Sequence, residues 1–75
     1  MGKATLANLA IGQAATVESL HANEAIARRL LDLGLIRGTK VRCLYRSLGR
    51  GMSAYLIRGA VIALRRRDAD SVFIS

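Results

Sequence analysis

A chain of 75 residues has room for one domain with a small core. Its 12 Lys and Arg against 5 Asp and Glu give a formal charge of +7, so we expect an anionic partner. One cysteine excludes an intrachain disulfide, and no apolar stretch reaches the ~18 residues of a membrane helix. The N-terminus lacks a signal-peptide pattern. We therefore expect a soluble cytoplasmic protein with no direct membrane insertion.

The first segment predicts one turn followed by a strand. Leu6 and Leu9 lie three residues apart and are expected to form a turn over the core. Residues 14–20 alternate like a strand, but Leu20 is out of phase with Val17. A bulge or strand end near Glu18 would explain the change of phase.

A helix is expected next, with a start signal at Asn23 and an end near Leu33. Asn23 can act as the N-cap, accepting a hydrogen bond from a free backbone N–H. Gly34 fits the left-handed residue that ends a helix, and in that motif Leu35 packs back on Leu30. The surface ion pairs expected on this helix join Asp32 to Arg28 and Arg29.

The remainder of the chain predicts short strands separated by glycine turns. Strands are expected over residues 39–46, 52–58, 60–64 and 71–75, with a helical turn inside 65–71. In the first of them Val41, Cys43 and Tyr45 should face inward, and the basic face should carry Lys40, Arg42 and Arg46. Short strands with one helix indicate a mainly β fold, a small antiparallel barrel with one short helix packed across it.

The basic residues concentrate in the second half of the chain. Between residues 37 and 67 there is no Asp or Glu, and the basic positions are 37, 40, 42, 46, 50, 58, 65, 66 and 67. A nucleic acid is one anionic partner to consider, but single-strand binders use aromatic side chains for base stacking. This chain offers only Tyr45, Tyr55 and Phe73, of which Tyr45 and Phe73 are expected inside. Nucleic acid is therefore disfavoured, and a lipid surface, an acidic protein and a solvated basic face without a partner are the other interpretations of this charge.

No catalytic or metal-binding spacing stands out. The single Cys43 and single His21 lack a second soft ligand at metal-site spacing, so one chain cannot assemble a tetrahedral site from them. Cys43 is interpreted as a small buried hydrophobe and His21 as exposed. A transition metal (Fe²⁺ or Zn²⁺) at a site shared between chains, built from His21 and carboxylates, stays open. With no nucleophile motif or phosphate loop, we expect a protein that is not an enzyme.

Several motifs together resemble one family. The ferrous iron transport protein A (FeoA) family is similar to this chain over nearly its whole length, through Thr5-Leu6-x-x-Leu9-x-x-Gly12, Arg29-Leu30-Leu31-Asp32-Leu33-Gly34-Leu35-x-x-Gly38-Thr39-x-Val41, Arg58-Gly59 and Ala63-Leu64-Arg65-Arg66 before Ala69. The resemblance implies an SH3-like barrel and an accessory role beside ferrous iron transport protein B, a membrane transporter with a cytoplasmic GTPase domain. The chain departs from the family at Arg37, where Pro is common, and at Gly49-Arg50-Gly51, where an acidic tip is common.

The expected function follows from this resemblance and from the charge. We expect residues 1–75 to form a single domain that binds the transporter's cytoplasmic GTPase region in bacterial ferrous iron uptake. Self-association stays open, and the alternative is a small basic nucleic-acid-binding or metal-responsive regulatory barrel. The residues expected to contact the partner lie on a hairpin, a turn and a helix end: Leu48, Arg50, Met52, Arg37, Arg29 and Leu33.

Overall fold

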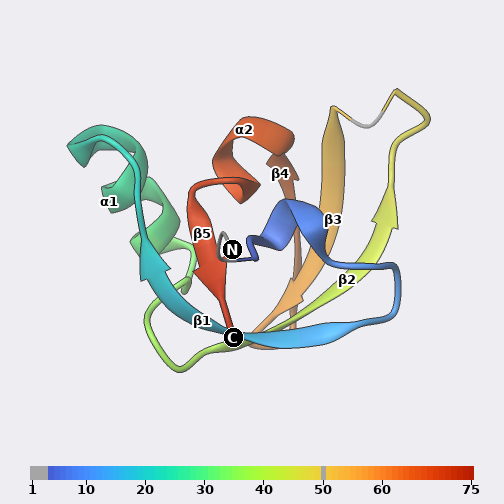
Figure 1. Ribbon diagram of the computed structural model, residues 1–75, viewed down its shortest axis with the longest axis horizontal. Helices are drawn as coiled ribbons and strands as arrows, with labels where there is room; N and C mark the ends of the chain where they lie inside the picture. The colour runs from blue at the N-terminus through green and yellow to red at the C-terminus, as the bar shows by residue number, and fades with distance from the viewer. Residues whose placement is uncertain (1–3, 50) are drawn as a thin grey trace.

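The computed structural model describes residues 4–49 and 51–75, which form one curved antiparallel sheet with short helical segments around it (Figure 1). The strand order is β4-β3-β2-β1-β5. In chain order the elements are η1 (Leu6–Asn8), β1 (Ala14–Leu20), α1 (Glu24–Asp32), β2 (Lys40–Arg46), β3 (Met52–Ile57), β4 (Ala60–Arg65), α2 (Arg66–Ala69) and β5 (Val72–Ile74). The expected elements are thus present in the expected order. No helix in the described ranges has the apolar length to cross a membrane.

The sheet curls because β1 pairs with two different strands along its length. Its first residues pair with β2, where Ala15 lies opposite Val41. Its last residues pair with β5, where Leu20 lies opposite Val72. The register shifts between Val17 and Ser19, so of the two explanations for the change of phase, a bulge or a strand end, the structure shows the bulge. A bulge bends its strand and increases the twist, which lets β1 serve both neighbours.

The core lies inside this curl and takes residues from every element. Its buried members are Leu6, Leu9, Val17, Leu30, Leu35, Val41, Cys43, Tyr55, Ile57, Leu64, Ala69, Val72 and Ile74. The turn η1 covers the open side between α2 and the β2–β3 hairpin (Figure 1), and it buries Leu6 and Leu9 as predicted. Cys43 is fully buried, which confirms its interpretation as a small hydrophobe.

Helix α1 begins and ends as its sequence predicts. The Asn23 side chain accepts a hydrogen bond from the Ile26 N–H at 3.0 Å. Gly34 has φ +101°, and the N–H of Leu35 donates to the Leu30 carbonyl at 3.1 Å. Leu30 and Leu35 are both fully buried, so the helix end is held by a hydrogen bond and by apolar packing.

Strand β2 contains a second bulge, and it makes one prediction wrong. Cys43 lies opposite Tyr55 but Tyr45 lies opposite Ala54, so Leu44 is the extra residue. An extra residue reverses the inward and outward alternation beyond it. Tyr45 was expected inside, but its side chain is on the outer face and 60% exposed.

The same bulge corrects the predicted basic face of β2. Lys40 and Arg42 are exposed as expected, but Arg46 is turned to the other side and is half-buried. Its guanidinium donates to the carbonyls of Ala7 and Leu9. Arg46 therefore connects the hairpin to η1 and to the residue that follows it.

The ion pairs expected around Asp32 are also wrong. Arg28 pairs with Glu24 at 3.8 Å on the same helix, and Arg29 pairs with Asp68 of α2 at 2.6 Å. In the part of the chain that the structure describes, no ion pair involves Asp32. Spacing along one helix could not reveal Asp68, because the two residues meet only after the chain folds.

Candidate functional site

The β2–β3 hairpin projects beyond the barrel at the upper right of Figure 1. Several of its apolar side chains are exposed. Leu48 is fully exposed, and Tyr45 and Met52 are also accessible. The Ser47 N–H donates to the Met52 carbonyl at 3.0 Å, which closes the base of the loop. We call Ile11, Tyr45, Arg46, Leu48 and Met52 the hairpin surface. Clustered exposed apolar side chains are typical of a protein-binding surface.

One side of the hairpin carries an open hollow of about 450 Å³. Its lining residues are Ala10, Ile11, Arg46, Ser47 and Leu48. Arg46 is fixed there by its contacts with the carbonyls of Ala7 and Leu9. Arg42 donates to the Gly12 carbonyl at 2.5 Å, so two arginines hold the loop before β1 against the hairpin. This arrangement places Ile11 beside Leu48 although the two are far apart in sequence.

The other side carries a smaller and mostly apolar hollow of about 80 Å³. It is lined by Tyr45, Ser47, Met52, Ser53, Ala54 and Ala63. The hollow exists because two alanines on neighbouring strands lie next to the larger Tyr45 and Met52. Ala54 and Ala63 lie directly opposite each other in the β3–β4 ladder.

A separate basic cluster lies at the other end of β2. Arg37, Lys40 and Arg58 are exposed and line a hollow of about 410 Å³ together with Gly38 and Thr39. Within the described ranges no acidic residue lines this hollow. Arg37, one of the predicted contact residues, therefore belongs to a different surface from Leu48 and Met52.

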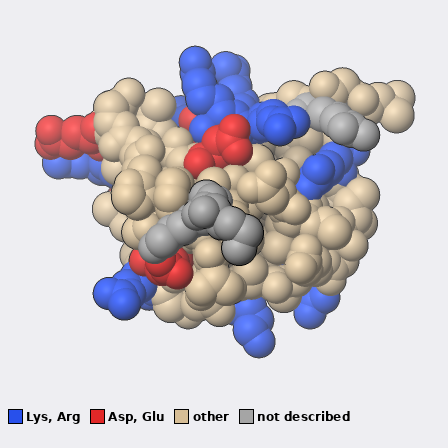
Figure 2. All heavy atoms as spheres, viewed as in Figure 1, with Lys and Arg blue, Asp and Glu red and all other residues tan. Residues whose placement is uncertain are grey.

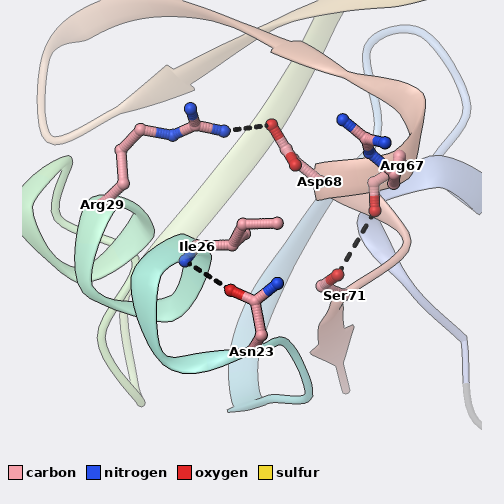
Figure 3. A network of polar contacts seen from close by, with 6 residues as sticks. All are labelled: Asn23, Ile26, Arg29, Arg67, Asp68 and Ser71. Atoms are coloured by element: carbon pink, nitrogen blue, oxygen red, sulfur yellow. Dashed lines mark hydrogen bonds and ion pairs between the residues drawn. The ribbon is translucent and has the colours of Figure 1, made fainter.

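The two contact residues predicted near the end of α1, Arg29 and Leu33, are engaged within the chain. Figure 3 shows Arg29 of α1 reaching across to Asp68 of α2. The Arg29 side chain is 61% exposed while that of Asp68 is 4% exposed, so the pair joins a surface cation to a nearly buried carboxylate. Leu33 is half-buried and packs against the core. Arg50 lies outside the described residues.

Among the predicted contact residues, Leu48 and Met52 are exposed on the same hairpin, Leu48 beside the hollow with Ile11 and Met52 beside the hollow with Tyr45 on the other side. Sequence reasoning missed Tyr45, because the β2 bulge leaves no trace in the alternation pattern. It also missed Ile11, although an exposed apolar residue next to Gly12 in a loop was a usable signal. In Figure 2 the red acidic side chains lie over the left and middle of the molecule, and the hairpin side at the right is tan and blue.

The described residues do not fit a metal site within one chain. Among residues 4–49 and 51–75, no group of three or more His, Cys, Asp or Glu could hold a metal ion. His21 is exposed, as predicted; its Nε2 lies 2.9 Å from Ser19 Oγ, and its ring centroid lies 4.2 Å from that of Phe73, with the two ring planes tilted by 37°.

Comparison with family models matches the FeoA domain to residues 4–75. The chain belongs to the FeoA family. The resemblance found in the sequence motifs is therefore confirmed. A search of curated proteins found no significant match.

Solved FeoA structures share the fold. The solution structure of FeoA from Chlorobium tepidum is 32% identical with a TM-score of 0.88, over 95% of this chain and 68% of that one. The crystal structure of FeoA from Stenotrophomonas maltophilia, complexed with zinc, is 36% identical with a TM-score of 0.83, over 96% and 89%. That protein is described as a procaryotic SH3 domain protein, and a role as a bacterial ferrous iron transport activating factor has been suggested for it. The mainly β, SH3-like fold class predicted from the sequence is confirmed.

The FeoA fold also occurs inside a larger regulator. A manganese-dependent transcriptional repressor in complex with manganese is 22% identical with a TM-score of 0.88, over 99% of this chain and 36% of that one. At this identity the likeness concerns the fold alone.

Proposed function

We propose that this FeoA-family chain is a non-enzymatic, cytoplasmic accessory protein of bacterial ferrous iron uptake. Its partner is the cytoplasmic GTPase region of the membrane iron transporter, ferrous iron transport protein B. Membership of the family supports the link to ferrous iron transport. The activating role suggested for the S. maltophilia relative supports an accessory function.

The observation that carries the proposal is the hairpin surface. Leu48 is fully exposed at the end of a hairpin whose base is fixed by hydrogen bonds and by Arg46. Apolar side chains of this kind supply most of the affinity of a protein interface, and charged residues at the rim mainly set the association rate. Leu48 and Met52 are therefore the proposed anchors, and Arg50 the proposed rim charge. Arg37, Arg29 and Leu33 stay predictions on separate surfaces.

The test is a titration of the purified chain with the transporter's GTPase region. It is run with GDP and with a non-hydrolysable GTP analogue, near physiological salt, with random DNA as comparator. We expect saturable binding that depends on the nucleotide and is tighter than binding to DNA. Binding to DNA alone, with an affinity that falls steeply as salt rises, would instead assign the chain to the nucleic-acid-binding alternative.

Two variants locate the interface, and a third serves as their control. Leu48→Asp should weaken binding about tenfold or more, because it removes an anchor. Arg50→Glu should weaken it at low salt by reversing a rim charge. Leu31→Asp changes an exposed leucine of α1 by the same substitution and should leave the affinity unchanged. Equal effects of Leu48→Asp and Leu31→Asp would remove the hairpin surface from the proposal.

A transition metal enters this proposal only as an ion shared between copies of the chain. The zinc complex of the S. maltophilia relative motivates it, and His21 with carboxylates of two chains would be the ligands. Sedimentation of the chain with Zn²⁺ or Fe²⁺ should then show a larger assembly that His21→Ala abolishes. An unchanged mass at saturating metal would reject this role for His21.

A further inference from the structure

The sheet has two edge strands, β5 and β4, and the chain protects only β5. Thr5 forms a bridge with Phe73, and the Ile74 N–H donates to the Ala4 carbonyl at 3.0 Å. For β4 the only strand partner recorded among the described residues is β3. One long edge of the barrel therefore has its backbone groups available.

The register of the β3–β4 hairpin shows which groups face outward. Ile57 and Ala60 flank a two-residue turn of Arg58 (φ 51°) and Gly59 (φ 83°), so they form a hydrogen-bonded pair. Hydrogen-bonded and non-hydrogen-bonded pairs alternate along an antiparallel ladder. The N–H and C=O groups of Val61 and Ala63 therefore point away from β3. No hydrogen bond within the described part of the chain uses them.

Before its last residue, Arg65, this edge lacks the features that usually prevent strand addition. Edge strands are commonly protected by bulges, by Pro, by charged residues or by being very short. The β3–β4 register runs through six pairs without a shift, and the chain has no Pro. Val61 is 61% exposed and Ala63 is also exposed. The middle of β4 can therefore accept another strand.

The middle of the face next to this edge is apolar. By the ladder alternation, its outward residues on β2, β3 and β4 include Tyr45, Met52, Ala54, Leu56, Val61 and Ala63, with Arg42 opposite Leu56 and Arg65 opposite Met52. The small hollow of about 80 Å³ opens on this face and includes Ala63 of β4 itself. Every second side chain of an added strand would lie on this face. One of those side chains could fill the hollow.

The positive charge around β4 indicates which kind of segment can bind at this edge. Arg58 precedes the edge, Arg65 ends it, and no Asp or Glu occurs between residues 37 and 67. A second copy of the chain also carries +7, and pairing β4 with β4 would bring the same arginines together. An acidic segment of another protein avoids this repulsion.

We propose that the β4 edge binds an extended, acidic segment of a partner protein, which adds as a further strand with one apolar side chain in the hollow beside Ala63. The proposed function supplies only the identity of the partner, which would be the GTPase region. The mode of binding rests on the exposed edge, the apolar face and the charge. It is a form of recognition in which main-chain hydrogen bonds give affinity and alternate side chains give specificity.

The direct test uses a blocked peptide of about eight residues in which valine and glutamate alternate. Amide hydrogen exchange is measured by NMR on the full chain, with and without the peptide. We expect the Val61 and Ala63 amides to become protected about tenfold or more. A peptide with lysine in place of glutamate should give no protection. Equal protection by both peptides, or protection absent from Val61 and Ala63, would overturn the proposal.

Variants of Ala63 distinguish the contribution of its backbone N–H to peptide binding from that of its side chain. Ala63→Pro removes the outward N–H at an edge position where Pro is tolerated, and should weaken peptide binding about tenfold. Ala63→Ser keeps the N–H and should bind like the parent. Ala63→Glu places a negative charge on the edge and should also weaken binding, whereas Ala25→Glu makes the same change on exposed α1 and should not. Circular dichroism checks that each variant folds. If Ala63→Pro does not fold, the peptide affinity of Ala63→Glu decides the test.

The same measurements distinguish this inference from the proposed function. If the GTPase region binds the parent chain but the peptide does not protect Val61 and Ala63, the edge inference fails and the proposed function stands. If the peptide binds with the expected protection but the GTPase region does not bind, the proposed function fails and the edge inference stands. Protection of Val61 and Ala63 that appears without peptide, together with a doubled mass, would assign the edge to a second copy and overturn the acidic occupant.

Discussion

Tyr55 shows how one buried side chain links the stability of this barrel to pH. It is fully buried, and its hydroxyl donates to the Leu6 carbonyl at 3.2 Å. Burial, which disfavours the charged phenolate, raises the pKa of Tyr55 above its ordinary value of 10.0. The folded state therefore holds this proton more tightly than the unfolded state does. This contribution to stability is complete below pH ~10 and is lost as the pH rises through the folded-state pKa.

We predict that Tyr55→Phe has opposite effects at neutral and alkaline pH. At pH 7 it should lower the free energy of unfolding by about 1 kcal/mol, because the Leu6 carbonyl loses the Tyr55 hydroxyl and keeps only the Leu9 N–H as a donor. Above pH ~10 the parent should lose stability faster than the variant, which has no phenol to ionise. Urea unfolding between pH 7 and 11 measures both effects. Tyr45→Phe, at an exposed tyrosine, is the control, and parallel pH profiles for parent and Tyr55→Phe would contradict the assignment.

The Arg29–Asp68 pair predicts an asymmetric response to substitution. Arg29→Ala leaves a nearly buried carboxylate without its cation, and Asp68 Oδ1 already has no hydrogen-bond partner. We expect a loss of about 1–3 kcal/mol in unfolding free energy. Asp68→Asn should cost less than about 1 kcal/mol, since the amide oxygen can still accept from an otherwise solvated Arg29. Denaturant titration of both variants measures the order, and the reverse order would contradict this account.

At the scale of elements, the end of α1 depends on one backbone conformation. Gly34 has φ +101°, and a Cβ there would lie 3.3 Å from Cδ of the flexible Arg58 side chain. The left-handed conformation, rather than the contact, should dominate, so Gly34→Ala is expected to cost about 1–2 kcal/mol. Thermal unfolding measures the loss. Gly49→Ala, where a Cβ meets nothing within 4 Å, should leave the melting temperature unchanged.

Features that depend on residues close together in the sequence could be predicted from the sequence. Features that depend on how one strand pairs with another could not. Asn23, Gly34 and the apolar spacing of α1 act within a few residues, so the helix and its ends were predictable. The phase change at Leu20 revealed the β1 bulge in the same way. The β2 bulge is visible only against β3, so Tyr45 and Arg46 were assigned to the wrong faces. Leu48 and Met52 were predictable as loop neighbours, but Ile11 joins them only through the fold.

For the whole molecule, the charge of +7 should govern how fast an acidic partner associates rather than how long it stays. Raising the salt from about 0.05 M to about 0.5 M shortens the screening length severalfold. We expect the association rate with the GTPase region to fall about tenfold while the dissociation rate changes little. Leu48→Asp should mainly raise the dissociation rate and change the association rate little. Stopped-flow mixing at several salt concentrations separates the two rates, and a salt effect confined to dissociation would contradict this division.

The fully buried Cys43 is a natural probe of how often the barrel opens. It is the only thiol in the chain and lies on the strand that joins the two halves of the sheet. A thiol reagent can reach it only when the barrel opens, so the labelling rate counts opening events without any engineered probe. A ligand that binds only the closed barrel should slow labelling by the factor by which it stabilises the fold. Binding of a ligand at the barrel surface, which has no cysteine of its own, could then be measured from the labelling rate of Cys43.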